Sequence, residues 1–147
     1  MSGTAEPCHR LAIRVYYEDT DAGGIVYYAN YLRFAERGRT EWLRELGFEN
    51  SQLLAQKGIA LAVRRVSADY LRPARLDDAL VVETRLTALR GASLDMAQAV
   101  HRGSEELVRM TLTLACMDAE GRARRLPAEV RNEMARFVAG GGGAAGD

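Results

Sequence analysis

Seven consecutive residues, 18–24 (EDTDAGG), combine carboxylates with a glycine turn directly before a helix-like pattern. The first backbone N–H groups of a helix have no intrahelical partner and carry a partial positive charge. Such groups bind anions, or stabilise the oxyanion that forms when a carbonyl is attacked. A neighbouring carboxylate, Asp19 or Asp21, can act as a base or as a nucleophile. The alternative interpretation is structural, with the aspartates capping the helix and the glycines only turning the chain.

Two known loop types do not fit this cluster. Asp19, Asp21 and Gly24 match part of a calcium-binding loop, but Gly23 replaces a ligand and Asn30 replaces the final glutamate. A phosphate-binding loop requires Gly-Lys-Ser/Thr after the glycines, and that sequence is missing. We therefore expect neither a calcium site nor a nucleotide site here.

The remaining metal-binding and nucleophilic residue types are few. His9 and His101 stand at the edges of predicted strands without metal-ligand neighbours at useful spacing, so we expect surface histidines and no metal site. Cys116 lies in an apolar segment and is expected in the core, and Cys8 beside His9 makes a poor chelate. Ser93 has no nucleophile-elbow context, which argues against a serine hydrolase.

Hydrophobic periodicity predicts the elements that position the acidic cluster. Residues 11–17 alternate as a half-buried strand does, with Val15 and Tyr17 on one side, and Asp19 and Asp21 continue that parity. A helix is predicted over 28–46, ended by Gly47. Its apolar stripe has helical spacing and comprises Tyr27, Tyr31, Ala35, Gly38, Trp42 and Leu46.

The rest of the chain reads as a second short helix, four strands and a terminal helix. The short helix is predicted over 51–57, ended by Gly58. The strands are predicted over 59–71, 79–89, 93–102 and 106–117, and the terminal helix over 128–138. Short connections favour antiparallel pairing. We expect an α+β fold in which one antiparallel five-stranded sheet packs on one long helix.

Length and composition limit the function classes. The 147 residues, 48% of them hydrophobic, predict one domain over 1–139 and a flexible glycine-rich tail over 140–147. The 20 basic and 20 acidic side chains cancel, which argues against nucleic acid as a partner. We expect no membrane span and no secretory signal, and two cysteines fit reduced thiols in the cytoplasm.

Four sequence blocks carry a family resemblance. They are YEDTDAGGIVYYANYL at 17–32, FAERGRTE at 34–41, YLRPARLDD at 70–78 and RGAS at 90–93. Together they resemble hotdog-fold acyl-CoA thioesterases of the 4-hydroxybenzoyl-CoA type. Within that family, the bacterial group encoded beside the Tol–Pal envelope proteins is the most similar. The resemblance covers about residues 12 to 128.

The resemblance implies a site and an assembly. It implies a sheet wrapped around the helix, a homodimer or homotetramer with active sites between subunits, and an acyl-CoA substrate, with acyl carrier protein as a second acyl donor. The catalytic carboxylate maps onto Asp21, acting as nucleophile or general base, and the oxyanion donor onto the backbone N–H of Tyr28. Close relatives often carry histidine at the position of Tyr28. This chain therefore lacks that imidazole but keeps the backbone donor. No metal or cofactor is implied, since a thioester is already activated.

Four residues complete the expected site by binding substrate: Tyr17, Gly24, Arg90 and Ser93. Arg90 in the predicted Arg90-Gly91 turn is the candidate contact for a CoA phosphate, and a solvated turn arginine is the alternative. The aromatic residues near the cluster suit an aromatic or a short aliphatic acyl group, and they suit an ordinary core equally well.

Two other functions fit the same fold. A hotdog dehydratase or hydratase usually relies on a histidine, and none occurs between Ile13 and Val100. A non-catalytic protein that binds acyl-CoA or acyl carrier protein in the envelope system would bind such ligands without releasing thiol.

Overall fold

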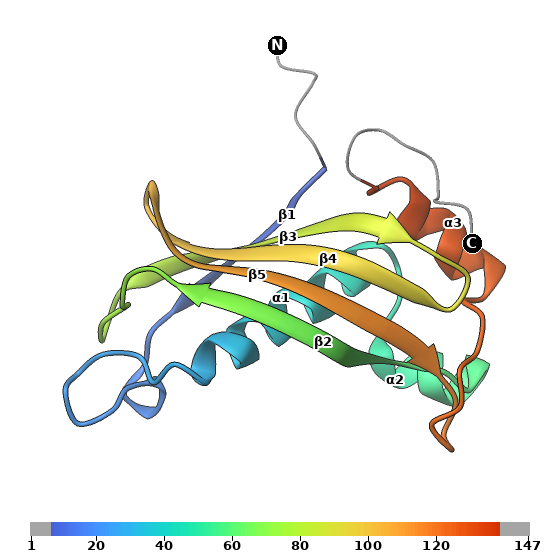
Figure 1. Cartoon of the computed structure of the whole chain (residues 1–147), viewed down its shortest axis with the longest axis horizontal. Helices are drawn as coiled ribbons and strands as arrows, with labels where there is room; N and C mark the ends of the chain where they lie inside the picture. Colours follow the sequence, from blue (N-terminus) through green and yellow to red (C-terminus); the bar gives the residue numbers. More distant parts are fainter. Residues whose placement is uncertain (1–6, 139–147) are drawn as a thin grey trace, which may run out of the picture.

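Five antiparallel strands form one sheet in the order β1-β3-β4-β5-β2 (Figure 1). The computed structural model describes residues 7–138. The strands are β1 (His9–Arg14), β2 (Ala60–Tyr70), β3 (Ala79–Leu89), β4 (Ser93–Arg102) and β5 (Glu105–Met117). The expected sheet is confirmed, with the predicted bounds of β3 and β4 reproduced. The predicted tail at 140–147 lies outside the described residues.

The long helix α1 (Asn30–Glu45) lies along one face of the sheet (Figure 1). Four residues of the predicted stripe are buried, Tyr31, Ala35, Gly38 and Trp42, and Phe34 and Leu43 are buried with them. Leu46 follows the helix and is only partly buried. Gly38 allows the closest approach, because a Cβ there would stand 2.8 Å from Cγ1 of Val82 on β3. The helix starts two residues later than predicted. Tyr27 therefore precedes it and is half exposed rather than part of the stripe.

Two short helical segments connect α1 to β2, and a terminal helix follows β5. The chain turns at Gly47, whose φ is +102°, and forms α2 (Asn50–Gln52) followed by a π-helical segment η2 (Leu53–Lys57). Gly58 ends η2 in the left-handed conformation, as predicted. The terminal helix α3 (Ala128–Ala135) buries Val130 and Met134 and ends three residues earlier than predicted.

The first strand is shorter than its alternation suggests. β1 ends at Arg14, and residues 17–19 form a 3-10 turn, η1 (Tyr17–Asp19). A strand parity cannot continue through a helical turn, so the predicted common orientation of Tyr17, Asp19 and Asp21 is wrong. Asp19 is buried, Asp21 is exposed, and the Tyr17 side chain is 81% exposed.

The sheet has an open edge at β2. This strand pairs only with β5, and it exposes three large apolar side chains, Val63, Val66 and Tyr70. No helix within residues 7–138 is long and apolar enough to cross a membrane.

Candidate active site

Asp19 organises the loop that carries the acidic cluster. Its Oδ2 accepts the backbone N–H of Tyr16 at 2.8 Å. Its carbonyl oxygen accepts the N–H of Tyr27 at 3.0 Å and Nδ2 of Asn30 at 2.8 Å. The last bond ties the loop to the first residue of α1. The side chain and carbonyl of Asp19 are thus both used in hydrogen bonds that shape the loop.

Asp21 stands at the exposed tip of a tight turn. Its N–H donates to the carbonyl of Ile25 at 2.9 Å, and its own carbonyl accepts the N–H of Gly24 at 3.0 Å. Oδ1 accepts the N–H of Gly23 at 2.9 Å, which fixes the carboxylate orientation. Gly24 has a φ of +79°, a conformation that favours glycine. Oδ2 has no hydrogen-bond donor among residues 7–138. The carboxylate is thus held in one orientation by Oδ1, while Oδ2 is available to a substrate or a water molecule.

A second segment, residues 74–78, is hydrogen-bonded to this turn and fixes its position. Val26 donates its N–H to the carbonyl of Ala74 at 2.9 Å, and the N–H of Leu76 donates to the carbonyl of Gly24 at 3.2 Å. The N–H of Ala74 in turn donates to the hydroxyl of Tyr31 at 2.9 Å. Burial raises the pKa of the Tyr31 hydroxyl, so it stays neutral. The turn is therefore fastened to the first turn of α1.

Asp78 anchors the other end of that segment. Its Oδ2 accepts the N–H of Arg75 at 2.8 Å and Nη1 of Arg102 at 2.7 Å. Burial alone raises the pKa of Asp78, but these two hydrogen bonds outweigh burial and hold the pKa below its usual value.

Tyr28 lies two residues before α1, where backbone N–H groups have no intrahelical acceptor. Within the described part of the chain, neither the N–H of Tyr28 nor that of Ala29 has a hydrogen-bond acceptor. The Tyr28 ring is 59% exposed and lies 4.9 Å from the ring of Tyr27 and 5.9 Å from that of Tyr70. A free donor pair at the start of a 16-residue helix suits an oxyanion.

The predicted CoA contacts, Arg90 and Ser93, are not part of the Asp21 loop. Arg90 pairs with the Asp95 carboxylate, with Nη1 at 3.1 Å from Oδ1, and Nη1 also donates to Oγ of Ser93 at 3.3 Å. The hydrogen bond from Arg90 holds the pKa of Asp95 below its usual value. Arg90 is thus in an ion pair rather than simply solvated in its turn.

Within one chain, the loop between β1 and α1, which carries Asp21, and the β3–β4 turn, which carries Arg90, lie at opposite ends of the sheet (Figure 1). Arg14, close before the Asp21 loop, pairs with Ala79 at the start of β3, whereas Arg90 follows the end of that strand. The 11 residues of β3 span ten steps of about 3.3 Å, or roughly 33 Å. A single subunit does not bring the predicted CoA contacts to the predicted catalytic carboxylate.

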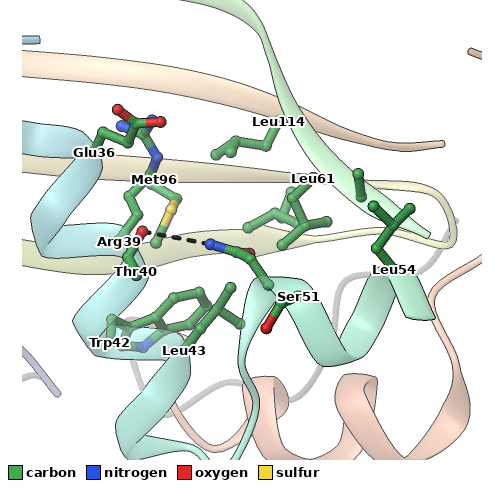
Figure 2. Close-up of a pocket in the computed structure, with 13 residues that line it drawn as sticks. Glu36, Arg39, Thr40, Trp42, Leu43, Ser51, Leu54, Leu61, Met96 and Leu114 are labelled. Carbon is green, nitrogen blue, oxygen red and sulfur yellow. Dashed lines mark hydrogen bonds between the residues drawn. The ribbon is translucent and has the colours of Figure 1, made fainter. Parts of the chain in front are cut away.

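A cavity of about 370 Å³ lies between α1, the α2–η2 segment and the sheet (Figure 2). Leu61, Leu94, Met96 and Leu114 from three strands form its apolar wall, and Leu54 of η2 lies at one side. Sequence patterns do not predict this cavity. Its residues are spread from 36 to 114 and have no common local pattern, so only the folded chain assembles them.

Each of the two histidines lies near a glutamate carboxylate. His9 lies 3.4 Å from Glu45 and His101 lies 3.2 Å from Glu83, and both are partly buried rather than surface side chains as expected. Among residues 7–138, no cluster of three or more His, Cys, Asp or Glu side chains is arranged to hold a metal ion. Cys116 is fully buried, as expected, and burial raises the pKa of its thiol.

Residues 15–138 match the family model described as the thioesterase-like superfamily. The chain belongs to this family. It is 46% identical over 106 residues to acyl-CoA thioesterase YbgC of Haemophilus influenzae, covering 72% of this chain and 78% of the relative. It is 42% identical over 127 residues to acyl-CoA thioester hydrolase YbgC of Escherichia coli O6:H1, covering 85% and 94%. The resemblance seen in the four sequence blocks is confirmed.

The fold agrees with a solved member of the family. A probable thioesterase from Bartonella henselae superposes with a TM-score of 0.80 at 41% identity, covering 82% of this chain and 99% of that one. The hotdog arrangement expected from sequence, a five-stranded antiparallel sheet with one long helix, is confirmed.

Proposed function

We propose that this protein is an acyl-CoA thioesterase that hydrolyses its substrate to a free carboxylic acid and CoA. Family membership and the names of two relatives more than 40% identical support this activity. The observation that carries the proposed site is local. Among the described residues, Asp21 presents one oriented carboxylate oxygen without a donor, on a turn that is fastened to the start of α1, and the N–H groups of Tyr28 and Ala29 just before that helix have no acceptor.

In the proposed reaction, the thioester carbonyl oxygen accepts the N–H of Tyr28, which stabilises negative charge as the carbonyl is attacked. Asp21 either attacks the carbonyl carbon itself or removes a proton from an attacking water. In both routes the C–S bond breaks, and the CoA thiolate leaves and takes up a proton. In the direct route Asp21 forms a mixed anhydride with the acyl group, and water opens it at the aspartyl carbon, so the product keeps an Asp21 oxygen and Asp21 gains one from water. In the other route water supplies the acid's new oxygen directly. The thioester is already activated, so these steps require positioning and charge stabilisation but no cofactor.

The two routes differ in where labelled oxygen appears. In a single turnover in H₂¹⁸O, direct attack by Asp21 first transfers an unlabelled carboxylate oxygen to the product. Water attack labels the product at once. Mass spectrometry of the released acid separates them.

The complete proposed site requires two subunits joined through β2. Val63, Val66 and Tyr70 expose apolar surface along this edge, and an open edge strand pairs readily with another strand. Two-fold symmetry joins identical edges antiparallel, so the two ends of β2 exchange neighbours. The Arg90 turn lies at the Leu61 end of β2, because Ala92 accepts the N–H of Cys116 and Cys116 pairs with Leu61. The Asp21 loop lies at the Tyr70 end.

The dimer therefore places Arg90 and Ser93 of one subunit near the Asp21 loop of the other. We assign these two residues to the CoA portion of the substrate. Tyr17, with its exposed ring, and Gly24, in the Asp21 turn, are assigned to the thioester end. A pair of such dimers would form a tetramer without altering this arrangement.

Light scattering at micromolar concentration tests the assembly. We expect at least a dimer, and a monomeric, active protein would contradict the two-subunit site. Val66→Glu places two carboxylates close to the symmetry axis, where like charges repel, so it should produce monomers and abolish turnover. Val66→Thr is the matched control, because it keeps the branched shape without a charge.

A thiol-release assay with acetyl-, propionyl-, benzoyl- and palmitoyl-CoA tests the activity itself. Release of CoA that disappears in Asp21→Asn supports the proposal. Tight binding of acyl-CoA without thiol release would indicate a binding protein instead, and water addition to crotonyl-CoA would indicate a hydratase.

The cellular setting proposed here rests on the motif resemblance. We place the enzyme in the cytoplasm, functionally linked to the Tol–Pal envelope proteins, with acyl carrier protein as a second acyl donor. Comparing turnover of one acyl group on CoA and on acyl carrier protein tests the second donor. Deletion of the gene, scored by resistance of the envelope to detergent, tests the link.

A further inference from the structure

The sheet has a second open edge, at β1. Among the described residues this strand pairs only with β3, and it lies at the opposite side of the sheet from β2. Directly after β1, Val15 donates its N–H to the carbonyl of Asp78 and accepts the N–H of Asp77, each at 3.0 Å. Successive residues of an antiparallel strand alternate between facing the paired strand and facing away from it. The N–H and C=O groups of Ala12 and Arg14 therefore point to the open edge.

The edge of β1 is free along its whole length. The backbone groups of Ala12 and Arg14 make no hydrogen bond to another part of residues 7–138. β1 is six residues long, so it offers about 20 Å of edge at roughly 3.4 Å per residue. A row of unpaired N–H and C=O groups accepts an extended segment of another chain by strand addition. The backbone of β1 thus supplies the hydrogen bonds that an added strand requires.

A groove of about 570 Å³ runs beside this edge, where β1, α1 and the start of β3 meet. Ala12, Ile13 and residues 79–81 form its apolar part. Arg14 and Arg37 are its two charged side chains, and no carboxylate lines it. The groove therefore combines apolar surface with two positive charges, next to unpaired backbone groups.

Both arginines of the groove are available to a partner. Within residues 7–138, neither Arg14 nor Arg37 forms an ion pair. Nη1 of Arg14 donates to the carbonyl of Asp77 at 3.0 Å, which orients the guanidinium without neutralising its charge. Cζ of Arg37 lies 5.9 Å from the centre of the Phe34 ring, a contact that likewise leaves the charge in place. The positive charge of the groove is thus oriented but not compensated.

The two arginines lie on different sides of the edge. Ile13 pairs with buried Leu80 on the helix-covered face of the sheet, so the side chain of Arg14 lies on the opposite face. Arg37 belongs to α1 and lies on the helix side. Neighbouring residues of an added strand also point to opposite faces. Two adjacent acidic residues of such a strand therefore reach Arg14 and Arg37 respectively.

A second copy of this chain fits the β1 edge poorly. Antiparallel pairing of two β1 strands, centred on Ala12, places Arg10 of one copy opposite Arg14 of the other. Both arginines are exposed on the same face of the strand. Like charges directly opposite each other destabilise a strand pair, whereas opposite charges stabilise it. The charges of this edge thus favour an acidic partner over self-pairing.

We propose that the β1 edge is a docking surface for an extended acidic segment of a different protein, which adds to the sheet as a further strand. The segment's backbone pairs with Ala12 and Arg14, and two adjacent carboxylates bind Arg14 and Arg37. β-Branched residues on either side of the acidic pair suit the apolar part of the groove beside Ile13. The inference is independent of the proposed thioesterase function, since none of these residues belongs to the Asp21 site.

A labelled peptide tests the charge contacts. Fluorescence anisotropy with fluorescein-SVTEEVTVS and the full chain should show binding. Arg14→Gln and Arg37→Gln should each raise the Kd about fivefold, the scale of an exposed charge contact. The peptide SVTQQVTVS, which lacks the two charges, should bind about tenfold more weakly or less. No binding of SVTEEVTVS at about 1 mM, or equal binding of the two peptides, would overturn the proposal.

Arg33→Gln is the matched control for these charge changes. Arg33 is exposed on the same helix as Arg37 but does not line the groove. Its replacement removes one positive charge and should change the Kd by less than about twofold, because separated exposed charges are screened by salt. A rise in Kd as large as that in Arg37→Gln would show general attraction to a basic surface and would contradict a defined docking site.

Proline at position 12 tests the backbone contacts. Proline has no N–H and is tolerated in an edge strand where that N–H faces solvent, so Ala12→Pro removes one edge donor and leaves the sheet intact. The Kd for SVTEEVTVS should rise about tenfold, the scale of one lost hydrogen bond together with a hindered approach. Ala12→Ser keeps the N–H and is the matched control. Equal affinity in the two variants would contradict strand addition.

Hydrogen exchange of the unaltered chain gives a second measurement. Bound SVTEEVTVS should slow exchange of the N–H groups of Ala12 and Arg14, which face the open edge. The N–H of Ile13 faces β3 and should be protected with or without the peptide. Binding without added protection at Ala12 and Arg14 would overturn the proposed pairing.

A lipid surface is the alternative occupant of a groove that contains exposed arginines. Sedimentation with phosphatidylglycerol vesicles separates the two, because lipid headgroups make no use of the edge N–H of Ala12. Vesicle binding that is lost when Arg14 and Arg37 are both replaced by glutamine, yet is retained in Ala12→Pro, would contradict a peptide partner if SVTEEVTVS does not compete.

Discussion

The hydroxyl of Tyr31 on α1 accepts the backbone N–H of Ala74 at 2.9 Å, in a place where both residues are buried. This bond joins the helix start to the segment that supports the Asp21 turn, because the Ala74 carbonyl also accepts the N–H of Val26. The relative position of the carboxylate and the helix N–H groups depends on it.

Removing that hydroxyl should loosen the site. Tyr31→Phe leaves a buried N–H without an acceptor, and we expect a loss of about 1–2 kcal/mol in the free energy of unfolding. We also expect kcat to fall more than KM changes. Thermal unfolding and steady-state kinetics measure the two effects. Tyr70→Phe is the control, since that ring lies 5.8 Å from Tyr31 but is half exposed. Equal effects from both changes would show that the hydrogen bond is not responsible.

Replacing the two aspartates distinguishes chemistry from loop structure. Asp21→Asn keeps the side-chain shape and removes the anion, so kcat should fall by at least ~10²-fold with the melting temperature unchanged. Asp19→Asn should instead lower the melting temperature, because it weakens the bond from Tyr16 N–H. Tyr28→Phe should have a much smaller effect on kcat than Asp21→Asn, since the proposed donor is the main chain. Near-normal turnover in Asp21→Asn would show that the catalytic carboxylate is misassigned.

Arg90→Ala should weaken binding of CoA substrates. We expect KM for acyl-CoA to rise about fivefold, the scale of an exposed charge contact, with no change for a short pantetheine thioester. Asp95→Asn is the control, because it breaks the same ion pair but keeps the guanidinium. If Asp95→Asn raises KM as much, the effect comes from the turn and not from a phosphate contact.

Gly38→Ala tests the packing of α1 on the sheet. The new Cβ would stand 2.8 Å from Cγ1 of Val82 and 3.0 Å from Oγ1 of Thr84. Overpacking of this kind costs about 1–3 kcal/mol, which exceeds the gain of about 1 kcal/mol from alanine's helix propensity. Chemical denaturation should show a net loss of stability. Arg33→Ala, exposed on the same helix, should leave stability nearly unchanged.

Low pH should destabilise residues 74–78, the segment that supports the Asp21 turn. The pKa of Asp78 lies below its usual value of 3.8 in the folded protein, so the unfolded chain binds more protons as the pH falls. The stabilisation by Asp78 is therefore complete above about pH 5 and is lost progressively as the pH drops toward the folded pKa. Asp78→Asn should lower stability at pH 7 and flatten its dependence on pH between about 5 and 3. An unchanged slope would contradict this role of Asp78.

Local sequence patterns are enough to predict most of the helices and strands and the glycine turn that follows Asp21. Alternation with a period of two, interrupted by Gly91 and Gly103, predicts β3 and β4 to the residue, because strand pairing and turn conformation are local properties. The spacing of Tyr31, Ala35 and Trp42 likewise predicts which face of α1 is buried.

Which residues those elements bring together follows only from how the folded chain packs. Local parity placed Tyr17 beside Val15 on the inner side. The 3-10 turn η1 instead interrupts the extended chain and leaves the Tyr17 ring exposed, because the Asp19 hydrogen bonds favour a turn over a longer strand. The pairing of Arg90 with Asp95 and the separation of Arg90 from Asp21 depend on how strands pair across the sheet. The cavity depends on contacts between residues up to 78 positions apart, from Glu36 to Leu114. Such contacts follow from packing of whole elements, and no local pattern encodes them.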